Sequence, residues 1–245
     1  MAGTKMKSVA LLSGGLDSVV ATNVAARKPG GVALALTFDY GQRSARREAK
    51  AARAVASELG ITWKLIKLPW LAELLPAALG QGAGTLPRPK AEELESTSRS
   101  RETARAVWVP NRNGVFLNIA AAHAEAIGAG SVVAGFNKEE AATFPDNSAD
   151  YMKRVSSAFA LSTRNKVRVV SPTARLDKAA IVRLGMKLGA PLDKVWSCYS
   201  GGTKMCAECE SCSRLLRALV DASAPRTVWP VSFRSLSGSA DKKSD

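Results

Sequence analysis

One short segment near the N-terminus constrains the fold of this chain more than any other. The apolar run Val9 to Leu12 leads into Ser13-Gly14-Gly15, and a helical pattern then runs from Leu16 to Ala26. This order predicts a strand, a tight turn and a helix. The two glycines allow positive φ, so consecutive N–H groups can point to one side, and the helix adds its positive N-terminal end. The segment therefore predicts a site for an anion such as pyrophosphate.

The side chains beside this turn refine the prediction. Ser13 and Ser18 can add hydroxyl donors, and Asp17 is suited to holding a cation or orienting the turn. No Gly-Lys-Ser/Thr sequence ends the turn, so cleavage of ATP between its α- and β-phosphates fits better than γ-phosphate transfer. The six residues from Ser13 to Ser18 resemble the SGGxDS signature of PP-loop ATP pyrophosphatases, which adenylate an oxygen and release pyrophosphate. The alternative is an ordinary Gly-Gly turn between a strand and a helix.

The composition is that of a globular protein with room for one α/β domain and a small appendage. Of the 245 residues, 46% are hydrophobic, and no apolar run is long enough to cross a bilayer. The first residues lack the apolar core of a signal peptide, so we expect a cytoplasmic protein with no membrane partner. The formal net charge of +14 favours anionic partners such as nucleotides and permits nucleic acid, but such charge is also common on solvated surfaces.

Five stretches of strand length, most of them apolar, alternate with helical patterns along the chain. The predicted strands are Val9 to Leu12, Gly31 to Phe38, Ile61 to Leu68, Ser131 to Gly135 and Val167 to Val170. The predicted helices are Leu16 to Ala26, Ser44 to Gly60, Trp70 to Leu79, Val115 to Ile127, Ala149 to Leu161 and Asp177 to Gly185. This alternation predicts an α/β fold with a doubly wound parallel sheet of five strands, in the order 3-2-1-4-5.

The expected organisation is one ATP-binding α/β domain over residues 1–190, with an active-site insertion at about 80–112. The regular pattern breaks down from Gly80 to about Arg105, which is typical of a loop over an active site. Residues 191–220 are expected to form a four-cysteine region and a helix. Residues 221–245 are expected to form a tail in which Trp229 to Phe233 docks on the body or on a partner subunit and the last residues are disordered.

Candidate ligand contacts gather where the predicted strands end, because parallel sheets bind ligands at their C-terminal edge. Thr37 and Phe38 end the second strand. Gly135 ends the fourth strand, where the predicted order makes it face Gly14 and Gly15. A glycine there lets the backbone pass close to a ligand.

Three basic residues are placed to meet an anion. Arg112 stands at the start of a predicted helix, with Asn113 as its N-cap, so its guanidinium can grip a phosphate or a carboxylate. Lys178 lies in the first turn of another predicted helix, where a lysine is disfavoured unless an anion shares the site or solvent screens it. Arg43 belongs to a basic stripe on the second helix, interpreted first as solvated surface and second as an anion contact.

The polar loop after the fourth strand is a candidate substrate site. Its carboxylates can accept the adjacent N–H and NH₂ donors of a guanine-like ring, and Phe144 offers a face for stacking. These carboxylates belong to Glu139, Glu140 and Asp146. The loop is therefore expected to cover the mouth of the nucleotide site.

All four cysteines lie within one short segment and have the spacing C-x7-C-x2-C-x2-C. They are Cys198, Cys206, Cys209 and Cys212. This spacing lets four thiolates converge on one tetrahedral ion. Since all four corners are filled, a structural zinc ion fits best, and an iron–sulfur cluster, which uses the same ligands, is the alternative.

The series of motifs resembles the 7-cyano-7-deazaguanine synthases of the queuosine pathway. The motifs are, in order, Ser13 to Ser18, Thr37 to Arg43, Val109 to Asn113, Pro145-Asp146, Leu176 to Ala179 and the four cysteines. The likeness runs from about Lys7 to Arg217, and its specificity lies in the series rather than in any one motif. It implies a fold like that of the adenine nucleotide α-hydrolases and, as the usual assembly, a homodimer.

The resemblance implies an ATP-dependent ligase that converts 7-carboxy-7-deazaguanine and ammonia into the 7-cyano compound. In that chemistry the carboxylate is adenylated and ammonia displaces AMP to give an amide. The amide oxygen is then adenylated in turn, and loss of AMP leaves a nitrile. ATP, Mg²⁺ and one structural Zn²⁺ per chain are the implied cofactors, and no nucleic-acid partner is expected.

The resemblance also assigns roles to individual residues. ATP binding falls to Leu12, Ser13, Gly14, Gly15, Leu16, Asp17, Ser18, Val19, Val20, Ala21, Thr22, Thr37, Phe38 and Gly135. The catalytic roles fall to Asp17, which supports magnesium, and to Arg112 and Lys178, which contact phosphate or carboxylate. The substrate contacts are Arg43, Glu139, Glu140, Phe144 and Asp146, and the four cysteines hold zinc.

Two positions depart from the family pattern. Family members often carry Tyr-Pro-Asp-Cys where this chain has Phe144 to Asn147, so neither that hydroxyl nor that thiol is available here. They also often carry glycine where Asn111 precedes Arg112. Asparagine tolerates the left-handed conformation, so the turn is expected to survive this change.

Two other functions fit parts of the sequence. A PP-loop tRNA-modifying thiolase with an iron–sulfur cluster would suit the positive charge, but the chain has no separate RNA-binding domain and its cysteines form one compact group. A nucleotide-binding module that docks through a zinc knuckle is the non-enzymatic alternative. Both rank below the synthase.

Overall fold

Five parallel strands form the central sheet of the protein, in the order β3-β2-β1-β4-β5. The computed structural model describes residues 6–82, 84–89, 93–94 and 97–234. The strands are β1 (Ser8–Leu11), β2 (Val32–Asp39), β3 (Thr62–Lys67), β4 (Ser131–Val133) and β5 (Arg168–Val170). The predicted fold class and strand order are confirmed.

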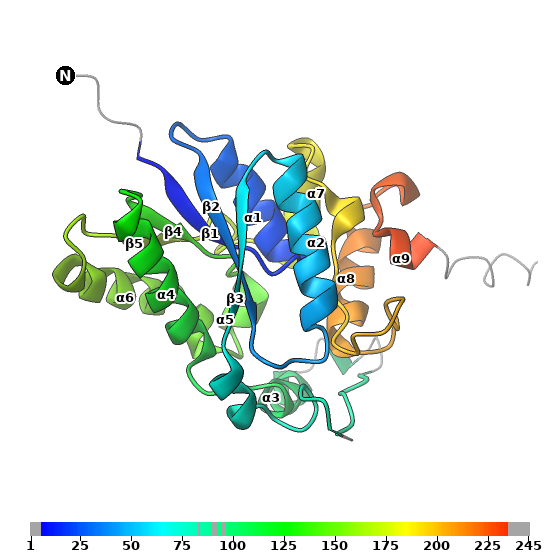
Figure 1. Cartoon of the computed structure of the whole chain (residues 1–245). Helices are drawn as coiled ribbons and strands as arrows, with labels where there is room; N and C mark the ends of the chain where they lie inside the picture. The colour runs from blue at the N-terminus through cyan, green and yellow to red at the C-terminus, as the bar shows by residue number, and fades with distance from the viewer. Residues whose placement is uncertain (1–5, 83, 90–92, 95–96, 235–245) are drawn as a thin grey trace, which may run out of the picture.

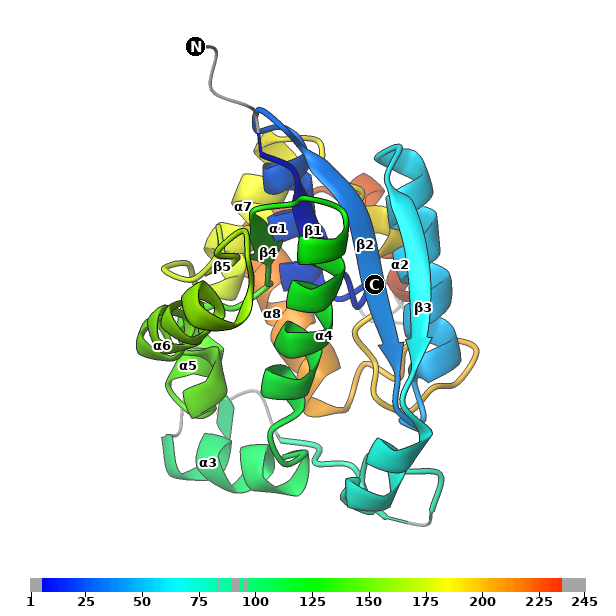
Figure 2. The same cartoon turned by 60° about the vertical axis from the view of Figure 1, so that its left-hand side comes forward.

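Helices cover both faces of this sheet (Figures 1 and 2). One face carries three helices, with a fourth packed on α7: α1 (Leu16–Ala26), α2 (Ala45–Glu58), α7 (Lys178–Lys187) and α8 (Glu210–Asp221). The other face carries α4 (Arg112–Ala126) and α6 (Ala149–Ser162). The chain changes face between β3 and β4, so the connections diverge between the neighbouring strands β1 and β4 and leave a crevice at their carboxyl ends. None of the helices in the described part of the chain is long and apolar enough to cross a membrane.

The shorter elements lie mostly in the connections near that crevice. They are the helices α3 (Thr97–Ala106), α5 (Lys138–Ala141) and α9 (Val231–Arg234) and the 3₁₀ turns Pro69–Leu74, Pro145–Asn147, Leu192–Lys194 and Arg226–Val228. Two predictions are wrong here. The stretch expected to be irregular contains α3, because its sequence is too polar to show an apolar period. The helix expected over Trp70 to Leu79 is only the turn Pro69–Leu74, because the extended residue before Pro76 ends it.

Two glycines let the first turn pack tightly against its neighbours. Gly14 has a φ of +85°, and a Cβ on it would lie 2.8 Å from the Cβ of Ala51. A Cβ on Gly135 would lie 2.5 Å from the backbone nitrogen of Ser18. Gly135 therefore packs against the first turn of α1, at Asp17 and Ser18, rather than facing Gly14 and Gly15 as predicted.

The C-terminal region shares the core of the α/β domain. Trp229 is 6% exposed and Phe233 is 1% exposed, and both pack in the apolar cluster that α1 and α2 form on one face of the sheet. The prediction that this segment docks on the body is confirmed. The expected disordered tail from residue 235 lies outside the described residues, and the proposed domain boundaries remain predictions.

The contact of Gly135 with Ser18 predicts that a single methyl group here disturbs the fold. Gly135→Ala would force the backbone of α1 away from β4, and we expect a loss of about 3 kcal/mol in the free energy of unfolding, at the upper end for overpacking. Urea unfolding measures this loss. Gly82→Ala is the matched control, since a Cβ at Gly82 meets no atom within 4 Å. Equal stabilities for the two variants would contradict the prediction.

Candidate active site

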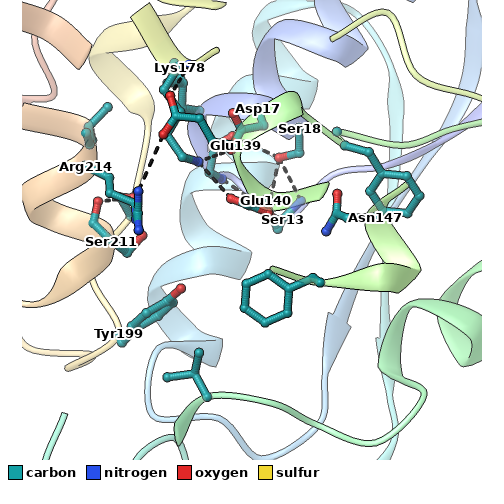
Figure 3. Close-up of a pocket in the computed structure, with 18 of the residues that line it drawn as sticks. Ser13, Asp17, Ser18, Glu139, Glu140, Asn147, Lys178, Tyr199, Ser211 and Arg214 are labelled. Carbon is teal, nitrogen blue, oxygen red and sulfur yellow. Dashed lines mark hydrogen bonds and ion pairs between the residues drawn. The ribbon is translucent and has the colours of Figure 1, made fainter. Parts of the chain in front are cut away.

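A cavity of about 750 Å³ opens at the carboxyl ends of the strands, a size that suits small-molecule ligands. It lies at the predicted crevice and is closed on one side by α8 and the cysteine region. Figure 3 shows the polar side chains that point into it. The predicted site residues that line it are Leu12, Ser13, Gly15, Leu16, Asp17, Ser18, Thr37, Phe38, Arg112, Gly135, Glu139, Glu140, Phe144 and Lys178.

The remaining predicted ATP contacts do not line this cavity. Gly14 belongs to the turn but does not line the cavity. Its carbonyl accepts a hydrogen bond from the backbone N–H of Trp196, at 2.9 Å. Beyond the first turn of α1, four residues predicted to bind ATP are at most 1% exposed and pack in the core: Val19, Val20, Ala21 and Thr22. They follow the motif in sequence, but the helix carries them away from the cavity.

Arg43 does not line the cavity either, so a substrate contact by its side chain does not fit the structure. Its guanidinium donates hydrogen bonds to the carbonyl oxygens of Ala77, Gly80, Gly82 and Gly84, at 2.5–3.0 Å. Arg43 therefore holds the loop after the Pro69–Leu74 turn. Sequence reasoning missed this because backbone carbonyls leave no trace in the side-chain pattern.

Asp146 does not line the cavity, but its neighbour Asn147 does. Burial raises the pKa of Asp146, although the positive charge of Arg112 lowers it. The expected N-cap Asn113 is also wrong: α4 begins at Arg112 and its N-cap is Asn111, with φ 50° and ψ 26°. The predicted left-handed conformation of Asn111 is confirmed.

The first turn of the chain is locked by hydroxyl groups and left open towards the cavity. The Ser18 hydroxyl donates to the Gly15 carbonyl at 2.9 Å and accepts from the Ser13 backbone N–H at 3.2 Å. The N-cap of α1 is Gly15, which has no side chain to cap the first-turn N–H groups. These donors and the positive end of the helix face the cavity, which is what an anion site requires.

Lys178 joins three elements at the centre of the site. Its Nζ lies 2.8 Å from Asp17 Oδ2 on α1 and 2.8 Å from Glu140 Oε1 on α5, and its side chain is 10% exposed. Burial alone would lower the pKa of Lys178, but the charges of Asp17 and Glu140 raise it. The anion expected beside this lysine is therefore supplied by the protein's own carboxylates.

Asp17 keeps one oxygen available for a ligand. Its Oδ2 meets Lys178, but its Oδ1 is buried and has no hydrogen-bond partner among the described residues. Burial raises the pKa of Asp17 to about 6, against the lowering effect of Lys178. An orphaned carboxylate oxygen beside an open anion site fits a divalent cation such as Mg²⁺, which carboxylates and phosphates hold together.

Two arginines on α8 reach the same region, and sequence reasoning missed both. Arg217 lies 2.9 Å and Arg214 3.6 Å from Glu139 Oε2, while the other oxygen of Glu139 accepts the backbone N–H of Lys178 at 2.8 Å. Glu210 pairs with Arg214 at 2.8 Å. Glu210, Arg214 and Arg217 lie three or four residues apart and so share one face of the helix. This spacing is the signal in the sequence that could have indicated a charged face.

The four cysteines form a compact group at the start of α8, which has Cys209 as its N-cap and includes Cys212. Their Sγ atoms all lie within 4.8 Å of one another. The Cys198–Cys206 and Cys206–Cys212 pairs are 3.5 and 4.0 Å apart. Four thiolates at about 2.3 Å from one ion in a tetrahedron would be roughly 3.8 Å apart, so the arrangement fits a metal ion. Tyr199, Ser197 and Ser211, from the same region, line the cavity, so this region forms part of the cavity wall.

One end of the cavity is aromatic and holds one more carboxylate. Phe116 stacks on Phe38 with ring centroids 4.1 Å apart, and Tyr40 lies 5.5 Å from Phe116. Glu48 on α2 lines this end and accepts hydrogen bonds from Ser44 and Gln42. The turn after the second strand, which includes Tyr40 and Gln42, was expected to border the nucleotide, but sequence reasoning named neither Ser44 nor Glu48.

Comparisons with known proteins agree with the series of motifs. A family model described as queuosine biosynthesis protein QueC matches residues 7–223. The chain is 52% identical to the 7-cyano-7-deazaguanine synthase of Pelotomaculum thermopropionicum, over 87% of this chain and 96% of that protein. It is 50% identical to that of Desulforudis audaxviator, over 90% and 100%, and 47% identical to that of Methanosarcina mazei, over 87% and 93%.

Some solved structures resemble the chain remotely. The U34-tRNA thiolase NcsA from Methanococcus maripaludis, which carries a [4Fe-4S] cluster, is 15% identical with a TM-score of 0.45, over 76% of this chain and 57% of that one. A likeness of this size has no bearing on function.

The position of Lys178 predicts a pH-dependent loss of stability when its charge is removed. Lys178→Met leaves Asp17 and Glu140 buried without their cation, and we expect a loss of about 3–5 kcal/mol in the free energy of unfolding at neutral pH. Their pKa values would then lie above those of the unfolded chain, so protonation relieves the penalty and the loss shrinks as the pH falls below about 6.

Urea unfolding at about pH 8 and about pH 5.5 measures this difference. Lys187→Met, at the exposed end of the same helix, is the control and is expected to change little. A loss of the same size at both pH values would show that Lys178 does not stabilise these carboxylates.

Proposed function

The chain belongs to the QueC family of queuosine biosynthesis proteins, and from this premise we propose that it acts as an ATP-dependent 7-cyano-7-deazaguanine synthase. The proposed substrates are 7-carboxy-7-deazaguanine, ammonia and two molecules of ATP, and the products include the nitrile, AMP and pyrophosphate. One structural observation at the site supports the proposal most directly. The uncapped turn from Ser13 to Ser18 opens into a cavity that also has room for an aromatic substrate.

In the proposed site, ATP lies with its β,γ-pyrophosphate on this turn. The Ser13 hydroxyl and the N–H groups at the start of α1 would donate to the phosphate oxygens, and Lys178 and Arg112 would balance their charge. Asp17 would hold Mg²⁺ through the oxygen that has no partner in the structure. When bound, the ion would neutralise negative charge on the phosphates.

The remaining residues are proposed to place the carboxylate of the substrate near the α-phosphate. Arg214 and Arg217 carry positive charge into the cavity from α8, and Glu139 fixes the position of both guanidinium groups. Attack of the carboxylate oxygen on the α-phosphorus releases pyrophosphate. Ammonia then attacks the activated carbon and displaces AMP to give the amide. The amide oxygen attacks the α-phosphorus of a second ATP and again releases pyrophosphate, and elimination of AMP with loss of the amide N–H protons leaves the nitrile. Phe144 stacks near Trp108, with ring centroids 6.0 Å apart, and is proposed to cover the substrate.

The function is tested by incubating the protein with ATP, 7-carboxy-7-deazaguanine and ammonium, and following pyrophosphate while mass spectrometry identifies the product. We expect the nitrile and two AMP per nitrile. Asp17→Ala is expected to lower kcat/KM at least about 100-fold, because the cation and the phosphates lose a charged ligand. The control is Asp193→Ala, at a partly exposed position in a 3₁₀ turn away from the cavity.

Each outcome separates a different part of the proposal. A product that stops at the amide would assign the altered segment Phe144 to Asn147 a part in the second half of the reaction. No pyrophosphate release with this substrate would contradict the synthase and favour a tRNA substrate.

The four cysteines are proposed to hold one structural zinc ion per chain, since four thiolates leave no open coordination position. Elemental analysis of the purified protein should find about one zinc and no iron, with no absorbance near 400 nm. Cys206→Ser is expected to lower both the zinc content and the melting temperature. It is also expected to lower activity, because α8 begins beside Cys209 and carries Arg214 and Arg217. A brown protein containing iron and sulfide would favour the thiolase.

The assembly and location of the protein are proposed by analogy with the family alone. We propose a homodimer that works in the cytoplasm. Light scattering after size-exclusion chromatography tests the first of these proposals.

A further inference from the structure

We propose that Glu48 recognises the edge of the substrate that carries the ring N–H and the 2-amino group of the deazaguanine. The proposal rests on the function proposed above and names a specificity residue for it. Glu48 lies in the first turn of α2, at the aromatic end of the cavity. The carboxylates predicted for this role from the sequence were Glu139, Glu140 and Asp146.

Two of those three carboxylates are held in ion pairs, and the third does not line the cavity. Glu140 pairs with Lys178 at 2.8 Å, and Glu139 pairs with Arg217 at 2.9 Å. Asp146 does not line the cavity. Within the described part of the chain, Glu48 is hydrogen-bonded but has no cation within the 4.0 Å of an ion pair, so a neutral ligand can approach this carboxylate without displacing a cation.

The carboxylate of Glu48 is held in a fixed orientation. Its Oε1 accepts from the Ser44 hydroxyl at 2.6 Å, and its Oε2 accepts from Gln42 Nε2 at 3.0 Å. Gln42 is itself 2% exposed, donates to the Phe38 carbonyl and accepts from the Tyr40 N–H. A carboxylate oxygen has more than one acceptor site, so both oxygens can still accept a donor from a ligand.

The chemistry of the ring edge then selects one ligand. A guanine-type edge presents two adjacent donors, which match the two oxygens of a carboxylate. Adenine presents one amino donor beside an acceptor nitrogen, which a carboxylate repels, so the adenine of ATP does not compete. Burial raises the pKa of Glu48 despite its two hydrogen bonds, and donors from a ligand would favour its charged form. The stacked rings of Phe116 and Phe38 and the neighbouring Tyr40 provide an aromatic wall beside it.

The test compares Glu48→Gln with the natural protein on two substrates, 7-carboxy-7-deazaguanine and the analogue that lacks its 2-amino group. The natural protein should prefer the full substrate about 10–100-fold in kcat/KM, since a site built for a donor rejects a ligand without it. In Glu48→Gln we expect the KM for the full substrate to rise by a similar factor and the preference to fall to about threefold or less. The KM for ATP should not change. Glu73→Gln, an exposed position, is the control.

The outcomes are distinguishable from those that test the function. A preference that survives in Glu48→Gln, or a rise in the KM for ATP alone, would overturn the proposal. Calorimetry measures the Kd of the full substrate and of the analogue for the natural protein and for Glu48→Gln. The ratio of the two Kd values gives the preference for the 2-amino group, so the role of Glu48 is tested even if no turnover occurs. If neither ligand binds the natural protein, both proposals fall. If Glu48→Gln does not fold, Ser44→Ala removes one anchor of the carboxylate and should reduce the preference several-fold.

Discussion

The contact of Lys178 with Asp17 and Glu140 is the interaction on which the rest of the site depends. It ties the start of α7 to the start of α1 and to the short helix α5, three segments that are far apart in the sequence. A buried lysine is tolerated only when paired, and two carboxylates in the same dry place would repel each other without it. The three charged side chains therefore stabilise one another. Together they fix the position of the anion-binding turn relative to α5 and α7.

The strand and helix pattern of the sheet could be predicted because most strands are apolar runs bounded by turn residues; β3, at the edge of the sheet, carries two lysines but keeps the length of a strand. The helix Leu16–Ala26 was predicted with the bounds observed. The failures have physical causes. The helix Thr97–Ala106 carries almost no apolar residues, and the helix expected after Trp70 is cut short by Pro76. The sequence pattern also cannot tell where a motif stops contacting a ligand, so the residues from Val19 to Thr22 were assigned to ATP although the helix turns them into the core.

The site itself could be predicted only where function follows from a local motif. Short stretches of sequence are enough to identify the turn at Ser13, the lysine of α7 and the four cysteines as site residues. Arg214, Arg217 and Glu48 do not, because their importance comes from the folding of distant elements onto one cavity. Arg43 shows the opposite error: a basic residue in a recognised motif is used for holding backbone carbonyls, a structural task that no side-chain pattern reveals.

The cysteine region also forms part of the cavity wall. It carries Tyr199, Ser211 and Arg214 to the cavity, and the segment after it packs through Phe233 against the same core as α1. On the ribosome, the turn that cradles an anion therefore emerges first and the wall that encloses it emerges last. During most of its synthesis the chain therefore has an anion-binding turn without the wall that encloses it, and the proposed metal ion can bind only after the last of the four cysteines has been made.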